Sequence, residues 1–246
     1  YQVVPANTVE TVLWAEADRM KGLAIDQDNL TNQQGVVKNE VKVNVLNQPY
    51  GGFPWIDMPM AANTNWQNAH NFYGDLAELD AATLQDAKAF FETYYAPNNA
   101  VVVVSGDIDP AQTLAWIRKY FGPIKASTLP TRPDISEPNQ TAEKRAVKEY
   151  LEAPRPAIAV GYHAPKRMTP EYFALALIDQ ILLQGKDSRL YQALVQEKGY
   201  TDDVSGGINA ELGNLFDING PTLFQAYLFH DKSTPAAAIL DTFDAE

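Results

Sequence analysis

Apolar residues recur at helical spacing in several stretches of the chain. Leu13 and Met20 continue the face begun by Val9, and Thr8 just before them is a suitable N-cap. This pattern predicts a helix over residues 8–23. The same criteria predict further helices over residues 28–45, 83–95, 110–121, 171–184 and 188–198, and from 235 to the end.

Other stretches have the patterns of strands or of irregular chain. Residues 100–104 form a continuous apolar run of one alanine and four valines, which is typical of a strand buried on both faces. With a predicted helix on either side, this run indicates one α–β–α passage of a layered domain. Further strands are predicted over residues 142–151, 157–162, 204–209 and 215–219. Residues 53–80, rich in Pro, Gly and Asn, are predicted to be irregular.

A change of character in the middle of the chain divides it into two domains. Residues 127–141 contain Pro130, Pro133 and Pro138 among Ser, Thr and Asn, a composition typical of a semi-rigid linker. The segments on either side mix helices and strands. We therefore expect one domain over residues 1–126 and a second over residues 142–246.

Composition excludes several classes of function. The 246 residues include 31 acidic and 19 basic side chains, for a net charge of -12, which argues against nucleic acid and against an anionic membrane surface as partners. No apolar run approaches the roughly 20 residues of a membrane span. Cysteine is absent from the sequence, which rules out disulfides, thiolate catalysis and cysteine-based zinc sites.

Glu40 is the strongest candidate for chemistry. Val36 and Val37 precede it by four and three residues, so Glu40 is expected at the edge of the apolar stripe of its helix. A carboxylate beside an apolar face needs a partner, and a metal ion is one such partner. A solvated glutamate on the helix surface is the alternative that spacing alone leaves open.

Short motifs along nearly the whole chain resemble, in the same order, those of bacterial members of the insulinase/pitrilysin family of zinc peptidases. In the first half they are Tyr1-Gln2-Val3-Val4-Pro5, Glu16-Ala17-Asp18-Arg19-Met20, Val36-Val37-Lys38-Asn39-Glu40, Asn47-Gln48-Pro49-Tyr50-Gly51, the stretch from Phe90 to Ala100, and Ser105-Gly106-Asp107. In the second half they are residues 157–161 and Gly185-Lys186-Asp187-Ser188-Arg189-Leu190-Tyr191.

The resemblance implies an α+β fold. Members of this inverzincin family, with its mitochondrial-processing-peptidase-like fold, pair two related domains of sheet and helices as a clamshell. Residues 1–126 would be the rear part of the N-terminal, catalytic-type domain, and residues 142–246 the front part of a second, non-catalytic domain. Both domains would be incomplete in this chain.

The resemblance also implies a zinc site to which this chain contributes one ligand. In the family, two histidines of an upstream His-x-x-Glu-His motif and a distal glutamate bind the ion, and the distal glutamate aligns with Glu40. The glutamate of the motif is the general base, so that base is expected upstream of Tyr1. His70, His163 and His230 do not form such a motif. Gln33 is a further departure, because some distant members carry a glutamate at that position.

The full-length parent is therefore expected to be a zinc-dependent metalloendopeptidase that cleaves peptides or unfolded segments in a closed chamber. The chain itself is expected to be inactive and to hold no zinc. Its expected partners are a peptide substrate and either the other half of its own chain or a homologous subunit. Relatives of this type suggest the bacterial periplasm or cell envelope. The alternative is a catalytically dead family member that serves as a binding or assembly subunit.

Two other catalytic motifs are incomplete in this sequence. Gly185-Lys186-Asp187-Ser188 looks like the end of a phosphate-binding loop, but the preceding glycine and strand are missing. The Gly-x-Ser-x-Gly pattern of many serine hydrolases does not occur. These two classes are accordingly set aside.

Overall fold

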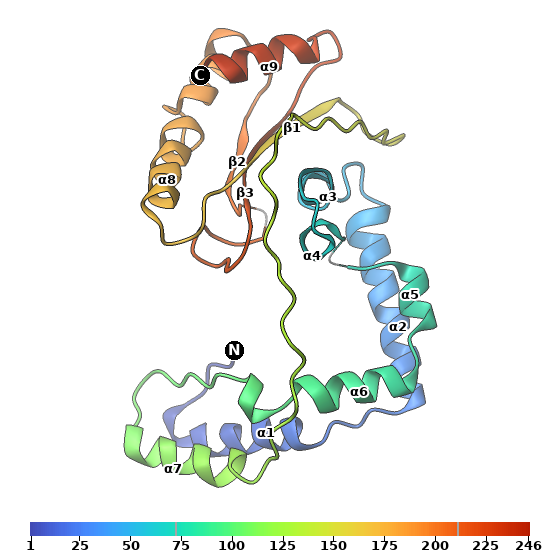
Figure 1. The fold of residues 1–246 in the computed structure, drawn as a ribbon, viewed down its shortest axis with the longest axis vertical. Coiled ribbons are helices and arrows are strands. Elements are labelled where there is room, and N and C mark those ends of the chain that lie inside the picture. Colours follow the sequence, from blue (N-terminus) through green and yellow to red (C-terminus); the bar gives the residue numbers. More distant parts are fainter. Residues whose placement is uncertain (72, 211) are drawn as a thin grey trace. The chain divides into compact units, whose positions relative to one another are not determined.

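The computed structural model describes residues 1–71, 73–210 and 212–246 (Figure 1). The chain divides into two compact units. One comprises residues 1–38 and 75–132, and the other comprises residues 39–74 and 133–246. Each unit thus combines two separate stretches of the chain, whereas the predicted domains, residues 1–126 and 142–246, are each one continuous stretch. The predicted domains stay a prediction.

The first unit is built from helices. They are α1 (Val9–Lys21), most of α2 (Gln27–Val41), α5 (Leu76–Ala81), α6 (Leu84–Tyr94) and α7 (Pro110–Phe121), with 3₁₀ turns at Ala6–Thr8 and Pro97–Asn99. Leu13 and Ala17 of α1 are buried against Phe121 of α7. The predicted helices over residues 8–23, 83–95 and 110–121 are confirmed.

Residues 100–104 do not form the predicted strand in this chain. They are extended, and the side chains of Val101 and Val103 are 90% and 82% exposed. Val104 packs on the cluster that α1 and α7 share. A strand buried on both faces needs neighbouring strands, and the described residues of this unit contain none. The valine run therefore has helices on one side only.

The second unit contains a small sheet with helices. Its helical elements are the π-helical turn η2 (Lys42–Leu46), α3 (Asp57–Ala62), α4 (Trp66–Ala69), α8 (Pro170–Leu182), the π-helical segment η4 (Tyr191–Glu197) and α9 (Ala236–Ala245). The antiparallel strands β1 (Ala157–His163), β2 (Ser205–Ile208) and β3 (Leu223–Phe229) lie in the order β1-β3-β2. Ala226 of β3 is paired with Val160 on one side and Gly206 on the other.

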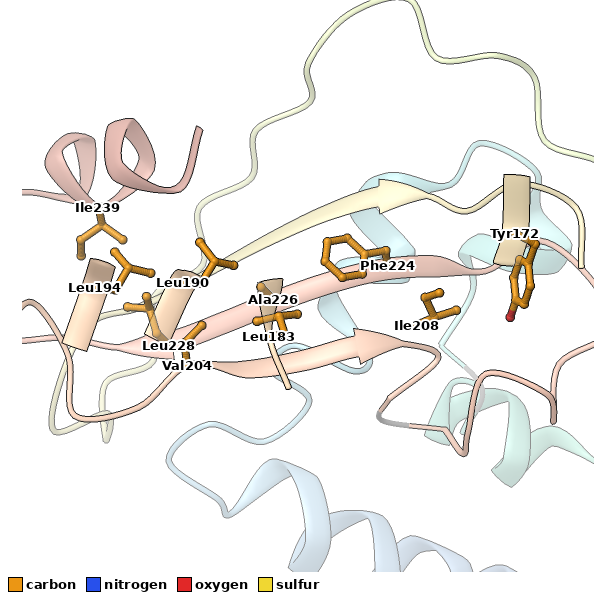
Figure 2. Packing of buried hydrophobic residues seen from close by; sticks show 10 residues of the cluster. All are labelled: Tyr172, Leu183, Leu190, Leu194, Val204, Ile208, Phe224, Ala226, Leu228 and Ile239. Carbon is orange, nitrogen blue, oxygen red and sulfur yellow. The ribbon is translucent and has the colours of Figure 1, made fainter. Parts of the chain in front are cut away.

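The central strand β3 places alternate residues on opposite faces of the sheet. Phe224, Ala226 and Leu228 belong to the main buried cluster. Figure 2 shows this cluster, which Tyr172 of α8, Leu194 of η4 and Ile239 of α9 complete, together with Leu190 just before η4. Rings of the intervening β3 residues meet rings of residues 50–53 on the other face. The sheet is therefore covered on both faces.

Several predictions for this unit were correct and several were wrong. Strands 157–162 and 204–209 are confirmed as β1 and β2, and the helices over 171–184, 188–198 and the last residues are confirmed. Strands were wrongly predicted over 142–151 and 215–219, and β3 was missed although Leu223–Phe229 is rich in apolar and aromatic residues. The stretch 53–80 contains α3, α4 and α5, and its residue 72 lies outside the described residues.

Side-chain anchors explain why residues 142–151 are extended without being a strand. Lys148 Nζ lies 2.7 Å from Asp57 Oδ1, and Tyr150 Oη donates to Asp57 Oδ2 at 2.5 Å. Lys144 Nζ donates to the carbonyl of Ala62. These bonds join alternate side chains of the segment to α3 instead of joining its backbone to a neighbouring strand. Val147, which points away from them, is 95% exposed.

Glu137 fastens the preceding part of the same segment. Its carboxylate accepts hydrogen bonds from the backbone N–H groups of Thr64 and Asn65, at 2.8 and 3.1 Å, and from Asn68 Nδ2 at 2.6 Å. Burial alone would raise the pKa of Glu137, but hydrogen bonds from Asn68, Thr64 and Asn65 outweigh it and hold that pKa below its ordinary value. The carboxylate therefore stays charged in the folded chain to a lower pH than in the unfolded chain.

The segment after α2 is held to the sheet by Tyr50. Its hydroxyl donates to the carbonyl of Arg155 at 2.8 Å and accepts from the N–H of the same residue at 2.9 Å. Its ring lies 4.5 Å from the ring of Phe229 on β3. Gln48 Nε2 donates to the carbonyl of Val43 and so satisfies one acceptor at the end of η2. The Asn47-Gln48-Pro49-Tyr50-Gly51 motif is thus a structural anchor.

Gly51 is required because its backbone lies against η2. A Cβ atom at this position would overlap the carbonyl of Val45. We expect Gly51→Ala to lower the free energy of unfolding by about 3 kcal/mol or more, because the clash is with backbone and cannot be relieved by a rotamer change. Chemical denaturation followed by circular dichroism measures this change.

Gly35 provides the matched control for Gly51. It lies in α2 with open space around the position of a Cβ atom. Gly35→Ala should raise the free energy of unfolding by about 0.5–1 kcal/mol, as expected in an exposed helix. Equal effects of the two substitutions would contradict the close approach at Gly51.

Glu137→Gln should weaken the attachment of residues 134–137. Glu137 is only partly buried, so we expect a loss of about 1 kcal/mol at neutral pH. Because the pKa of Glu137 is lowered on folding, its contribution is present above the unfolded pKa and is lost as the pH falls through the folded pKa. Unfolding free energies measured from pH 7 to pH 3 should therefore converge for the two proteins at the acidic end. A constant difference across that range would contradict the assignment.

Candidate metal centre

Glu40 lies in the last turn of α2, directly before the π-helical turn η2. Val41 and Val45 are buried, so this end of the helix is fixed by packing. Single π-helical turns inside or beside α-helices occur frequently at functional sites. The helix end, the π-helical turn and the Tyr50 anchor together position Glu40 on an ordered part of the second unit.

The side chain of Glu40 is exposed, in contrast to the predicted place at the edge of a buried stripe. The stripe itself is narrow: Val41 is buried, Val37 is partly buried and Val36 is 50% exposed. Burial therefore does not oblige Glu40 to take a partner in this chain. Because the carboxylate of Glu40 is in contact with water, there is no cost of burying its charge that a metal ion would have to offset. The case for a metal ligand therefore depends on the position of Glu40 alone.

Within the described residues, the side chain of Glu40 takes part in no hydrogen bond and no ion pair. The neighbouring Lys38 is different, because its Nζ lies 2.5 Å from Asp80 Oδ1. Both carboxylate oxygens of Glu40 are thus available, and carboxylate oxygen is a normal zinc ligand. The group fits the role of one ligand, but one ligand does not hold a zinc ion.

The described part of the chain holds no cluster of three or more His, Cys, Asp or Glu side chains that could bind a metal ion. Asp202 forms an ion pair with Arg155, and Asp203 accepts a hydrogen bond from Ser205. These two acidic residues therefore serve local structure. Among the described residues, Glu40 therefore has no group of further metal ligands beside it.

Two of the histidines are engaged locally. His70 Nδ1 lies 2.8 Å from the carbonyl of Trp66, to which it donates, and its ring stacks on the Trp66 ring at 4.4 Å. His163, at the end of β1, is partly buried and its Nε2 lies 3.1 Å from Asn63 Oδ1. Each histidine thus has a structural partner of its own.

The third histidine, His230, is buried. Its side chain is only 4% exposed, and its Nδ1 lies 2.9 Å from the backbone carbonyl of Asp231. The backbone of His230 also bonds to Pro156 and bridges to Thr201. The pairing of β3 with its two neighbours thus extends one residue beyond the strand, to His230, which is buried there.

Among the residues that the structure describes, no helix has both the length and the apolar character needed to cross a bilayer.

A protein-family model matches two thirds of the chain. The match covers residues 81–243, and the family is described as the Peptidase M16 inactive domain. The zinc protease PqqE of Helicobacter pylori is 28% identical over 187 residues, which are 74% of this chain and 41% of that protein. This chain therefore spans less than half the length of that relative.

Solved structures share the fold. A protease from Helicobacter pylori superposes with a TM-score of 0.81 at 22% identity, covering 97% of this chain and 56% of that one. The periplasmic protease PqqL from Escherichia coli gives a TM-score of 0.62 at 13% identity, covering all of this chain and 29% of that one. The α+β fold expected from the sequence motifs is confirmed, as is the resemblance to zinc peptidases. The chain belongs to the M16 peptidase family, through its Peptidase M16 inactive domain.

Proposed function

We propose that this chain is part of a zinc-dependent metalloendopeptidase and that Glu40 is one of the zinc ligands. The observation that carries the proposal is a carboxylate without a partner among the described residues, on a helix end that packing and the Tyr50 anchor hold in place. The relative PqqE is named a zinc protease, which supports the class of activity.

Zinc, when bound, supplies a Lewis acid and lowers the pKa of a bound water to about 7. The contribution of this chain is to offer the Glu40 carboxylate at a fixed place. The buried Val41, at the end of α2, and Val45, in η2, hold the backbone that follows Glu40, and Gly51 allows the loop to fold back on η2. A ligand positioned in this way requires little reorganisation on binding.

The same proposal makes the isolated chain inactive. The described residues provide no second and third ligand beside Glu40. None of the three histidines belongs to a His-x-x-Glu-His motif, so the sequence also lacks the glutamate that would be the general base. The full-length parent would act on peptides or unfolded segments inside a chamber formed with its other half or a homologous subunit. A location in the bacterial periplasm or envelope is supported by the likeness to a periplasmic protease.

A second candidate function is a catalytically dead binding or assembly subunit. The description of the matching family as an inactive domain favours it. The residues that precede Tyr1 in the parent distinguish the two candidates. An intact His-x-x-Glu-His motif there supports the peptidase, and a degenerate motif supports the dead subunit.

Glu40→Gln in the full-length parent should lower zinc affinity at least about 100-fold and reduce peptide turnover to a similar extent, because a neutral amide replaces a charged ligand. Zinc content by atomic absorption and hydrolysis of a fluorogenic peptide measure the two effects. Glu92→Gln is the matched control, since Glu92 is an exposed glutamate on α6. Unchanged zinc content and turnover in the Glu40 variant would show that the assignment is wrong.

The isolated chain of 246 residues should not hold zinc stoichiometrically, because Glu40 supplies a single ligand. Dialysis against micromolar zinc followed by metal analysis should give well under one ion per chain. One tightly bound ion per chain, retained after a weak chelator, would overturn the proposal that the other ligands lie elsewhere.

A further inference from the structure

Two side chains of α2 bind the end of α5. Gln34 Nε2 donates to the carbonyl of Leu79 at 2.7 Å and to that of Ala82 at 3.1 Å. Four residues further on, Lys38 Nζ lies 2.5 Å from Asp80 Oδ1. Residues four apart share a face of a helix. Two successive turns of α2 are therefore held to α5, beside which the helix lies (Figure 1).

The end of α5 is itself fixed by the start of α6. The last carbonyl groups of a helix lack the partner four residues on, and here Gln34 supplies donors for two carbonyls at this end. Thr83, the next residue, caps α6. Its hydroxyl accepts from the N–H of Asp86 at 3.2 Å, and its own N–H donates to Asp86 Oδ2 at 2.8 Å. The carbonyls that Gln34 binds thus belong to a turn that is closed by side-chain bonds.

Glu40 follows the held stretch without a break. It lies two residues after Lys38 in the same α-helix, Gln27–Val41. Side chains two residues apart do not face each other on a helix, and Lys38 pairs with Asp80 and not with Glu40. Gly35 lies within the held stretch, and a glycine loosens a helix interior because its backbone has more freedom than that of other residues. Contacts on both sides of Gly35 therefore restrict the bending of α2 just before Glu40.

We propose that Gln34 and Lys38 are positioning residues for Glu40, an inference that rests on the proposed function, in which Glu40 binds zinc. They act through the backbone of α2 and touch neither the metal nor the substrate. By holding the helix against α5, they set the direction in which its last turn presents the carboxylate. A ligand whose direction is set before the metal arrives loses less conformational freedom on binding, which raises metal affinity.

A purely stabilising role makes a different prediction. The side chains of Lys38 and Asp80 are 32% and 56% exposed, and exposed ion pairs contribute little to the free energy of unfolding. If the pair served stability alone, its removal would change little in the protein. If the pair positions Glu40, its removal lowers zinc affinity in a protein whose stability is almost unchanged. Zinc affinity and melting temperature, measured on the same variants, separate the two roles.

Lys38→Met in the full-length, zinc-loaded parent is the first test, because it removes the ion pair and keeps a long side chain. Loss of a positive charge near a cation would by itself raise zinc affinity, so a decrease reports positioning. Direct hydrogen-bond partners of metal ligands contribute about 10–100-fold to affinity. Since Lys38 acts one step further away, we expect a decrease of about 5-fold, and of about 10-fold when Gln34→Ala is added. Competition with a chelator of known zinc affinity measures both decreases.

Lys42→Met is the matched control. Lys42 lies two residues after Glu40, as Lys38 lies two residues before it, but Lys42 is exposed and forms no ion pair among the described residues. This variant should keep the zinc affinity of the parent or raise it slightly. Lys38→Arg, which is long enough to reach Asp80, should keep it as well. Cobalt(II) in place of zinc reports ligand geometry through its visible absorption, which should change in the Gln34→Ala/Lys38→Met double variant and stay unchanged in Lys42→Met.

Unchanged zinc affinity and cobalt absorption in the folded double variant would overturn the inference, as would equal losses in Lys38→Met and Lys42→Met. Lys38→Met alone decides if the double variant does not fold. The Glu40→Gln variant separates this inference from the proposed function. If Glu40→Gln retains the zinc of the parent, the proposed function fails and the positioning inference fails with it. If Glu40→Gln loses zinc while the double variant binds it as tightly as the parent, the proposed function stands and the positioning inference alone fails.

Discussion

The double hydrogen bond between Tyr50 and the backbone of Arg155 is the contact on which the second unit depends. It ties the segment that follows α2 to the start of β1, while the Tyr50 ring lies against Phe229 on the central strand. A tyrosine suits this position because it combines a large apolar ring with one polar group. Together with the ring contacts of Phe53 with Tyr227 and Phe229, it holds the segment that follows Glu40 on the sheet of the same unit.

The sheet is small, and its stability comes from being covered on both faces. Helices α8 and α9 and the segment η4 bury one face of β3 (Figure 2). Residues 50–53 cover the other face with aromatic rings. The segment 134–150 adds polar attachments through Glu137, Lys148 and Tyr150. Of these, Glu137 lies in the proline-rich stretch 127–141, whose composition is typical of a semi-rigid linker, and Lys148 and Tyr150 lie beyond it.

Helices were predictable because their apolar spacing and their caps are local, as in α7 and α8, which Asp109 and Thr169 cap. Strands were less so, since pairing depends on residues far away in sequence. The valine run has an ideal strand composition but lacks partners here, whereas β3 pairs on both edges and was overlooked. Glu40 was found through its resemblance to a family motif, and its exposure could not be predicted from Val36 and Val37. The anchoring role of Tyr50 needed Arg155, 105 residues away.

The central claim is that Glu40 belongs to a zinc site whose other ligands lie outside this sequence. A crystal structure of the full-length parent, with anomalous data collected at the zinc absorption edge, tests it most directly. The account predicts a zinc peak about 2.0–2.2 Å from a carboxylate oxygen of Glu40, together with further ligands from residues that precede Tyr1. A bound zinc ion whose coordination sphere does not include Glu40 would contradict it.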